Sequence, residues 1–318
     1  MQQERILVIK HGALGDLIQA LDGFASIRKG HPDAYLVLLT TPPFARFARF
    51  MPWFDAVLED RRASIFNLAA NLNLLNLLTD PWDRVYDFQC SRRTTRYFRL
   101  VLRHCKGRFF GVAKGASDPL PAMDGINNRD RMMMTAALGG CPDTSAELDW
   151  LSADACNHLA GETFFPEARS FPVPQVLLMP GCSAAKPSKR WPAERYAGVA
   201  KSLVESGLQV AVTGTAADRA SAEVIFAAEP RVLDLVGKTD LIALAHCCAD
   251  AKLVIGNDSG PVFLAARIGT PTLMLMGGDT DPAMSAPRGA NAHWLRADPI
   301  TDLSLEQVTE HGLGLLCR

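Results

Sequence analysis

The sequence predicts an α/β protein built from two doubly wound, Rossmann-like domains. Short apolar runs, typical of buried parallel strands, alternate with segments of helical periodicity. The alternation stops in a stretch rich in proline and phenylalanine that follows Gly161, and it starts again at Val176. A chain of 318 residues has the length of about two domains. We therefore expect domains at residues 1–165 and 175–318, joined by a linker at 166–174.

The composition is that of an ordinary globular protein. The chain is 48% hydrophobic and 21% charged, and its formal net charge of -1 gives no chain-wide field for a polyanion. The eight cysteines are scattered, without the spacing of a zinc site or a redox motif, which is typical of a reduced, cytoplasmic protein. We see no signal peptide and no apolar run long enough to cross a membrane. Because the chain has no chain-wide positive field, we expect no nucleic-acid partner.

In the first domain, a strand at 5–9 leads into the glycine turn Lys10–Asp16 and then into a helix that starts near Leu17. Such a turn lies at the carboxyl end of a parallel strand, where ligands of open α/β sheets bind. The turn matches neither a dinucleotide fingerprint nor a phosphate-binding P-loop. Asp16 would serve either a ligand at this edge or the helix alone, as its N-cap. Further strands are expected at 35–39, 55–58 and 84–88, and further helices at 42–51, 64–78 and 127–138.

Arginines are concentrated in the second half of this domain. Arg92, Arg96, Arg99 and Arg103 recur at three- and four-residue spacing, so they would share one helix face. Other basic residues of this group are Arg93, Lys106 and Arg108, and Arg61 and Arg62 add to it earlier in the chain. A solvated face is the ordinary explanation. The alternative is a groove for an anionic acceptor such as a phosphorylated or carboxylated lipid headgroup, which arginine can bind through two hydrogen bonds.

The second domain is organised around the stretch Gly256–Pro261. A buried strand at 252–255 precedes it, and a helix that ends at Gly269 follows it, with Asp258 and Ser259 at the join. Unpaired N–H groups and the helix dipole make such a point attractive to phosphate. The alternative is that these two residues only cap the helix.

Most other strand ends of this domain also carry small polar residues, which indicates a nucleotide site. Ser183 closes one such turn, and Lys189 stands two residues before Trp191, where it could neutralise a departing diphosphate or simply lie on the surface. We expect strands at 176–179, 209–213, 232–235 and 271–276, and helices at 192–203, 219–228, 241–248 and 302–315.

Four stretches, at 10–16, 180–192, 214–218 and 256–261, together resemble the ADP-heptose:lipopolysaccharide heptosyltransferases of glycosyltransferase family 9. The resemblance implies the GT-B fold, in which two Rossmann-like domains face a cleft. It implies Asp16 as the general base. It implies donor binding by Ser183, Lys189, Asp218, Thr239, Asp258, Ser259 and Gly260, with Thr239 at the adenine and Asp218 at the ribose. It implies acceptor binding by Gly15, Arg61, Arg62, Arg92 and Arg93.

The expected function is inverting transfer of heptose from ADP-heptose to the anionic lipid A and inner-core acceptor. We expect no cofactor and no obligatory metal, because no DxD-like pair stands at a donor-side strand end. A peripheral contact with the cytoplasmic face of the inner membrane is compatible with such an acceptor. This chain departs from the family at Phe263, where a histidine is common. It also departs in the helix after Asp16, which in the family usually contains a proline, whereas here Asp22 lies near that position. Alternatives are another sugar or acceptor, a nucleotide-sugar-binding protein without activity, and a sugar-nucleotide epimerase of similar fold.

Overall fold

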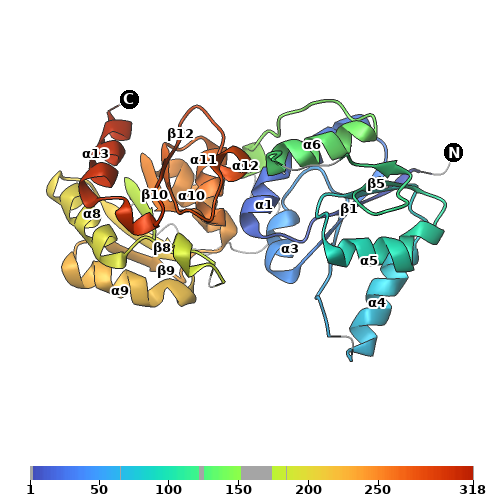
Figure 1. Cartoon of the computed structure of the whole chain (residues 1–318), viewed down its shortest axis with the longest axis horizontal. Coiled ribbons are helices and arrows are strands. Elements are labelled where there is room, and N and C mark those ends of the chain that lie inside the picture. Colours follow the sequence, from blue (N-terminus) through green and yellow to red (C-terminus); the bar gives the residue numbers. More distant parts are fainter. Residues whose placement is uncertain (1–2, 65, 122–124, 152–173, 184, 318) are drawn as a thin grey trace. The chain divides into compact units, whose positions relative to one another are not determined.

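The computed structural model describes residues 3–64, 66–121, 125–151, 174–183 and 185–317. The chain divides into two compact units, Met1–Trp150 and Leu151–Arg318 (Figure 1). Residues 166–173 of the predicted linker lie outside the described part, so the linker at 166–174 stays a prediction. Within the described ranges, no helix has both the length and the apolar character needed to cross a bilayer.

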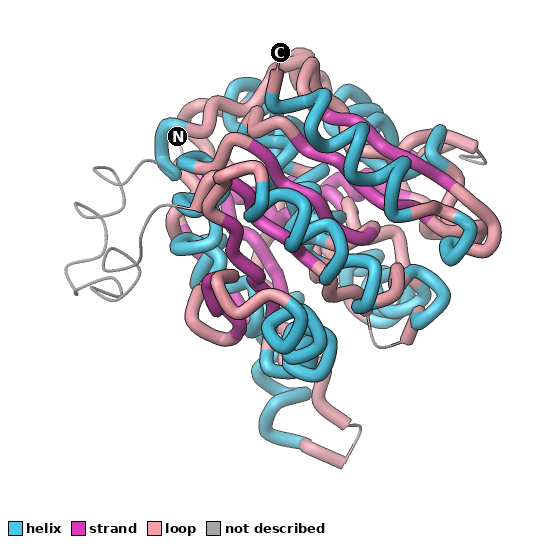
Figure 2. Tube along the Cα trace, turned by 90° about the vertical axis from the view of Figure 1, so that its left-hand side faces the viewer, coloured by secondary structure: helices cyan, strands magenta, loops and turns pink. Residues whose placement is uncertain are grey.

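The first unit is a six-stranded sheet in the order β3-β2-β1-β4-β5-β6, and every pairing is parallel. Helices cover both faces of the sheet (Figures 1 and 2), which explains why the central strand is a continuous apolar run rather than an alternating one. The strands are β1 Arg5–Ile9, β2 Tyr35–Thr40, β3 Ala56–Glu59, β4 Arg84–Asp87, β5 Arg108–Gly111 and β6 Asp118–Pro119. The α-helices are α1 Leu14–Gln19, α2 Leu21–Gly30, α3 Pro42–Ala48, α4 Leu68–Thr79, α5 Arg92–Leu100 and α6 Asn128–Leu138.

The second unit repeats this plan with the sheet order β12-β11-β10-β7-β8-β9, again parallel throughout. The strands are β7 Val176–Met179, β8 Val210–Gly214, β9 Leu233–Val236, β10 Leu253–Asn257, β11 Thr272–Met276 and β12 Ala292–Arg296. The α-helices are α8 Ala193–Glu205, α9 Arg219–Ala228, α10 Leu241–Asp250, α11 Gly260–Ile268, α12 Pro282–Ser285 and α13 Leu305–Leu316. In chain order each sheet reads 3-2-1-4-5-6, the doubly wound arrangement of a Rossmann fold.

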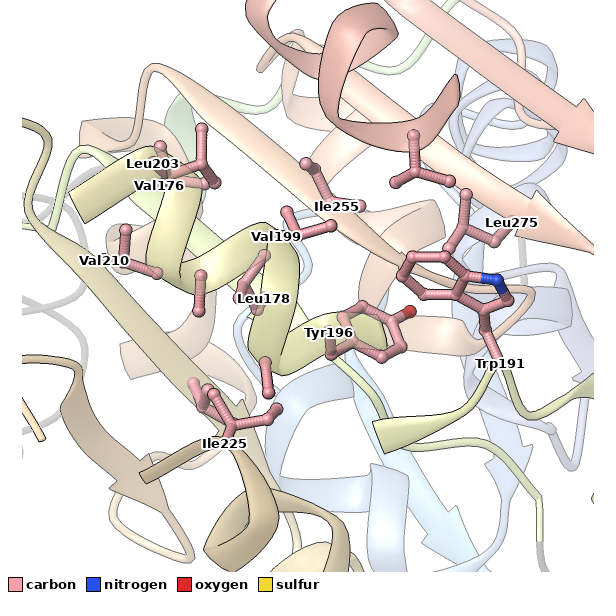
Figure 3. Packing of buried hydrophobic residues seen from close by; sticks show 14 of the residues in the cluster. Val176, Leu178, Trp191, Tyr196, Val199, Leu203, Val210, Ile225, Ile255 and Leu275 are labelled. Atoms are coloured by element: carbon pink, nitrogen blue, oxygen red, sulfur yellow. The ribbon is translucent and has the colours of Figure 1, made fainter. Parts of the chain in front are cut away.

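The core of the second unit lies between its sheet and α8 (Figure 3). Trp191 and Tyr196 are fully buried there and meet edge to face, with ring centroids 5.0 Å apart. The indole Nε1 donates to the Leu303 carbonyl at 2.9 Å. A buried indole must find such a partner, so Trp191 fixes the loop before it.

The predicted fold class is confirmed, and the predicted strands are found within one or two residues of their expected ends. Several other predictions were wrong. The helix expected at 64–78 begins at Leu68, where the Asn67 side chain accepts from the Ala70 N–H, and the last helix begins after the Ser304 cap, not at residue 302. The strands β5, β6 and β12 and the short helix α12 were not predicted.

The arginine face predicted along α5 is shorter than expected. The helix ends at Leu100, so Arg103 lies in a separate 3-10 turn, Leu102–His104, and does not extend the row. Arg92, Arg96 and Arg99 remain exposed on α5.

Candidate functional site

Each sheet places one of the predicted aspartates, Asp16 or Asp258, near the point where the strand order reverses. In open α/β sheets, ligands bind beyond the carboxyl ends of the strands at this switch point. In the first unit it lies between β1 and β4, and in the second between β7 and β10. The turn after β1 covers residues 10–13, because α1 already begins at Leu14 and not near Leu17 as predicted; Asp258 directly follows β10.

The start of α11 presents hydrogen-bond donors that the protein itself does not use. Ser259 is the N-cap residue, yet its side chain makes no capping bond, and its buried Oγ has no hydrogen-bond partner. Across the described residues, the N–H groups of Ser259 and Gly260 also have no acceptor. The interpretation that Asp258 and Ser259 only cap this helix is therefore wrong. Three free donors at a helix N-terminus form a site suited to an anion.

A lysine is held beside this helix start by Asp258. Lys189 Nζ lies 2.5 Å from Asp258 Oδ2, and Thr280 Oγ1 donates to the same oxygen at 2.6 Å. The side chains of Lys189 and Asp258 are 18% and 6% exposed, respectively. The carboxylate is thus neutralised by an ammonium that still reaches solvent.

The loop that carries Lys189 is anchored on the end of β10. The Trp191 N–H donates to Asn257 Oδ1 at 3.1 Å, and the Tyr196 hydroxyl donates to the same oxygen at 3.0 Å. The Asn257 amide in turn donates to the Pro180 carbonyl at 2.7 Å. Asn257 therefore ties the loops after β7 and β10 together. We did not predict this role, although Asn257 lies inside the motif.

Asp218 has a structural place in its own turn. Its Oδ2 accepts from the Thr215 N–H at 3.0 Å and from the Thr215 hydroxyl at 2.9 Å. Arg190 Nη2 lies 3.4 Å from its Oδ1. A Cβ on Gly181 would come within 2.6 Å of this carboxylate, so the β7 turn needs glycine there.

The two other predicted donor residues lie at neighbouring strand ends. Ser183 is exposed after β7, and its carbonyl accepts from the Lys186 N–H at 2.9 Å. Thr239 follows β9, with its hydroxyl 3.4 Å from that of Thr213 at the end of β8. Neither residue contacts Lys189 or Asp258 through a hydrogen bond within the described part of the chain.

In the first unit, Asp16 is not a helix cap. It is the third residue of α1, whose N-cap residue is Ala13, so the interpretation of Asp16 as the N-cap was wrong. Its Oδ1 accepts from Asn128 Nδ2 at 2.7 Å, and Lys10 Nζ lies 4.0 Å from its Oδ2. The Asp16 side chain is 40% exposed, so a substrate hydroxyl can reach it. The neighbouring Gly15 lies in the first turn of the same helix.

The groups that hold Asp16 come from the residue directly after β1 and from α6. Lys10 is 1% exposed, and its Nζ lies 3.5 Å from the Phe88 carbonyl. Burial lowers the pKa of Lys10 to about 8, although Asp16 acts in the opposite direction. Arg131 Nη2 donates to the same carbonyl at 3.1 Å and to Asn128 Oδ1 at 2.7 Å. We did not predict Asn128 or Arg131, because nothing in the sequence links them to a turn more than a hundred residues away.

Asp60 organises the arginines that were predicted to bind an acceptor. Its carboxylate accepts from Arg93 Nε at 2.9 Å and Nη2 at 3.0 Å, from the Tyr97 hydroxyl, and from the Arg62 N–H at 2.8 Å. Burial alone would raise the pKa of Asp60, but these hydrogen bonds outweigh it and hold the pKa below its usual value. Arg93 is therefore engaged inside the protein, whereas Arg61, Arg62 and Arg92 are exposed.

His11 lies beside this cluster, with Nε2 3.2 Å from Asp60 Oδ2. Burial lowers the pKa of His11 to about 4, so its ring is neutral near pH 7 despite the carboxylate. The next residue, Gly12, has a φ of +113°, and a Cβ there would overlap the Phe44 ring. A side chain at this position would therefore force the turn between β1 and α1 to move.

The two departures from the family pattern are both buried. Asp22 accepts from Arg129 Nε at 2.5 Å and from the Ala146 N–H at 2.8 Å, so it joins α2 to α6 and to the chain near residue 146. Phe263 lies in α11 and is 7% exposed. Its ring offers no hydrogen bond to a ligand at the helix start.

Comparison with known proteins places this site in a family. The pattern of Glycosyltransferase family 9 (heptosyltransferase) matches residues 130–309, more than half of the chain. The lipooligosaccharide heptosyltransferase 2 of Haemophilus influenzae is 34% identical over 128 residues. That match covers 39% of this chain and spans 36% of the length of the relative.

Solved structures share the fold over the whole chain. The glycosyl transferase family 9 protein from Veillonella parvula has a TM-score of 0.81 at 20% identity, covering 100% of this chain and 99% of that one. The Escherichia coli heptosyltransferase WaaC with ADP has a TM-score of 0.78 at 19% identity, covering 98% and 99%. These likenesses confirm the two-domain α/β fold of the GT-B class. With the family pattern matched over more than half of its length, the chain belongs to glycosyltransferase family 9, the heptosyltransferase family.

Proposed function

We propose that this protein is an inverting glycosyltransferase that moves heptose from ADP-heptose to a hydroxyl of the lipopolysaccharide inner core. The observation that carries the proposal is the start of α11, where three free donors lie beside the lysine held by Asp258. Family membership and the binding of ADP by the E. coli protein support it.

The diphosphate of the donor would bind at this helix start. The N–H groups of Ser259 and Gly260 and the Ser259 hydroxyl would donate to its oxygens, while Lys189 neutralises charge. A carboxylate would repel a diphosphate, so we assign Asp258 to holding the Lys189 ammonium rather than to touching phosphate. Donors arranged before the reaction stabilise the charge that develops on the leaving diphosphate without rearranging.

Asp16 would act as the general base. It takes the proton from the acceptor hydroxyl while the oxygen attacks the anomeric carbon and the bond to the diphosphate breaks, which inverts that carbon. Asn128 binds one carboxylate oxygen and leaves the other, near Lys10, for the substrate proton. The scheme uses no cofactor, because Lys189 and the helix start meet the charge of the leaving group.

On the acceptor side, we assign the anionic groups of the inner core to the exposed Arg61, Arg62 and Arg92. Arg93 would act on the acceptor through Asp60, which bonds both the Arg93 guanidinium and the Arg62 backbone. Asp60 therefore fixes the start of the loop after β3, which carries Arg61 and Arg62.

The substitution Asp16→Asn tests the proposal. Asn keeps the size of the side chain but cannot accept the proton, so kcat should fall by about 10²–10⁴-fold while ADP binding and the melting temperature stay nearly unchanged. The assay is heptose transfer at saturating ADP-heptose, with Asp250→Asn, an exposed aspartate at the end of α10, as the matched control. Full activity in a stable Asp16→Asn variant would leave the mechanism without its base. ADP binding by the wild type without transfer would instead favour a nucleotide-sugar-binding protein.

A further inference from the structure

Helix α4 turns an apolar face toward solvent. Leu68, Leu72 and Leu75 follow one another at four- and three-residue spacing, so they share one side of the helix. They are 72%, 56% and 42% exposed, and Phe66, just before the helix, is 87% exposed. Scattered exposed leucines are ordinary, but a continuous stripe of them marks an interaction site. We call these four residues the apolar face.

The opposite side of α4 is already used. Leu74, Leu77 and Leu78 pack into the core of the first unit together with Phe98 of α5 and Leu102 of the following turn. The helix is therefore held in place by its inner side, and Figure 1 shows it projecting from the edge of this unit. Its orientation does not depend on the apolar face, which remains free for a partner.

The chain segments that carry the apolar face and α5 are basic. The segments 61–79 and 88–117 hold no aspartate and no glutamate, and α4 itself carries no charge. The two carboxylates that flank the first segment, Asp60 and Asp80, pair with Arg93 and Arg5. The exposed basic residues of these segments, which we call the basic rim, are Arg61, Arg62, Arg92, Arg96, Arg99, Arg103 and Lys106. Among the described residues, no carboxylate forms an ion pair with any of them.

We propose that α4 docks on the surface of an anionic lipid bilayer. The apolar face would enter the boundary between headgroups and acyl chains, and the basic rim would contact lipid phosphates. An uncharged helix face beside a cluster of arginines has the two features that bind interfacial helices to anionic membranes. The inference rests in part on the proposed function, because the basic rim includes Arg61, Arg62 and Arg92, which we assigned to the acceptor. It goes beyond that function in giving α4, Arg96, Arg99, Arg103 and Lys106 a role in binding the bilayer itself.

Charge disfavours one rival partner, and the apolar face disfavours the other. A second copy of the chain, paired face to face about a two-fold axis, would bring the same unneutralised arginines of both copies together. A nucleic acid would meet the basic rim, but it would gain little from leucines, because single strands bind through stacking on aromatic rings. Phe66 is the one aromatic residue of the apolar face.

The test measures binding of the full-length protein to vesicles by co-sedimentation. Wild type should pellet with vesicles of phosphatidylcholine and phosphatidylglycerol, and much less with phosphatidylcholine alone. The combined substitution Leu68→Gln, Leu72→Gln and Leu75→Gln should lower the partition coefficient by about tenfold or more, because apolar area no longer leaves water. Met134→Gln with Leu138→Gln, at exposed apolar positions of α6, is the matched control and should bind like wild type.

A second pair of variants tests the charges. Arg96→Gln with Arg99→Gln should weaken binding by about tenfold to thirtyfold and flatten its salt dependence. Lys29→Gln with Lys252→Gln, exposed lysines outside the basic rim, should not. Thermal melts and ADP titrations of every variant separate loss of docking from loss of fold or of donor binding.

Four results would overturn the inference. One is wild-type protein that stays in solution with anionic vesicles at low salt. Another is equal pelleting of wild type and the leucine variant when both are folded. The third is a dimer in sedimentation velocity that dissociates in the leucine variant, which would assign the apolar face to a second copy. RNA binding that the arginine variant loses, without any vesicle binding, would also contradict it.

Discussion

Replacing Lys189 by Met should separate phosphate binding from the rest of donor recognition. The ammonium lies 2.5 Å from Asp258 Oδ2 and is 18% exposed, so a bound diphosphate can share it without breaking the existing pair. A charge-assisted hydrogen bond of this kind contributes roughly 1.5–3 kcal/mol. Loss of one such contact should raise the Kd for ADP by roughly 10- to 150-fold.

The carboxylate that remains makes the effect larger than one hydrogen bond. In Lys189→Met, Asp258 keeps the Thr280 hydroxyl but has no cation, and its charge then acts against the diphosphate. Adding Asp258→Asn removes that charge, so the double variant should bind ADP more tightly than Lys189→Met alone. The single variant Asp258→Asn completes a double-mutant cycle, whose coupling energy measures the pair.

Isothermal titration with ADP and with adenosine provides the assay. Adenosine has no phosphate, so its affinity should be the same in wild type and in Lys189→Met. Lys186→Met, at an exposed lysine three residues earlier, controls for loss of a nearby charge. An unchanged Kd for ADP in Lys189→Met, or an equal loss for adenosine, would refute the assignment of Lys189 to the phosphates.

Two further predictions concern buried charges of the first unit. Asp60→Asn should lower the free energy of unfolding by roughly 2 kcal/mol at pH 7, as expected when a hydrogen-bonded charge is lost. Because the pKa of Asp60 is depressed in the folded protein, wild type loses this contribution as pH falls through that pKa. Urea melts near pH 3 should therefore show a smaller difference in stability between wild type and Asp60→Asn. The pKa of Lys10 is about 8 in the folded protein, so between pH 8 and 10.5 only the unfolded chain holds this proton. The free energy of unfolding of wild type should therefore rise across this window by on the order of 3 kcal/mol. Lys10→Met should not show this rise.

The fold could be predicted from the sequence wherever strands are buried on both faces. A run such as Ile6–Ile9 can be recognised because every residue is apolar, and the strand predicted at 5–9 has the same bounds as β1. β12 was missed because Ala292–Arg296 lies at the sheet edge, half-exposed, and mixes His, Trp and Arg. β5 was missed because Arg108 continues the basic run and Gly111 ends it, so four residues show no period.

The positions of the site's turns could be predicted from the sequence, but the partners of its charged groups could not. Strand, glycine and helix signals lie within a few residues of one another, so the loops around Asp16 and Asp258 were placed from the sequence alone. The partner of each charged group comes from a distant element: Asn128 from α6 for Asp16, and Arg93 from α5 for Asp60. Arg93 was assigned to a ligand because an arginine in a basic run looks the same whether it is exposed or bound to a carboxylate 33 residues away.

The two units each place a lysine beside an aspartate at the switch point, and burial gives the two lysines different roles. Lys10 is 1% exposed and lies 4.0 Å from Asp16, whereas Lys189 is 18% exposed and lies 2.5 Å from Asp258. An enclosed ammonium cannot reach a ligand, so Lys10 can act only by its charge on the neighbouring carboxylate, and Asp16 is the group that meets solvent. At the second site the order is reversed: the carboxylate is enclosed and the ammonium is accessible. The first arrangement suits removal of a proton from a hydroxyl and the second suits binding of a diphosphate, which are the two tasks that the proposed transfer requires.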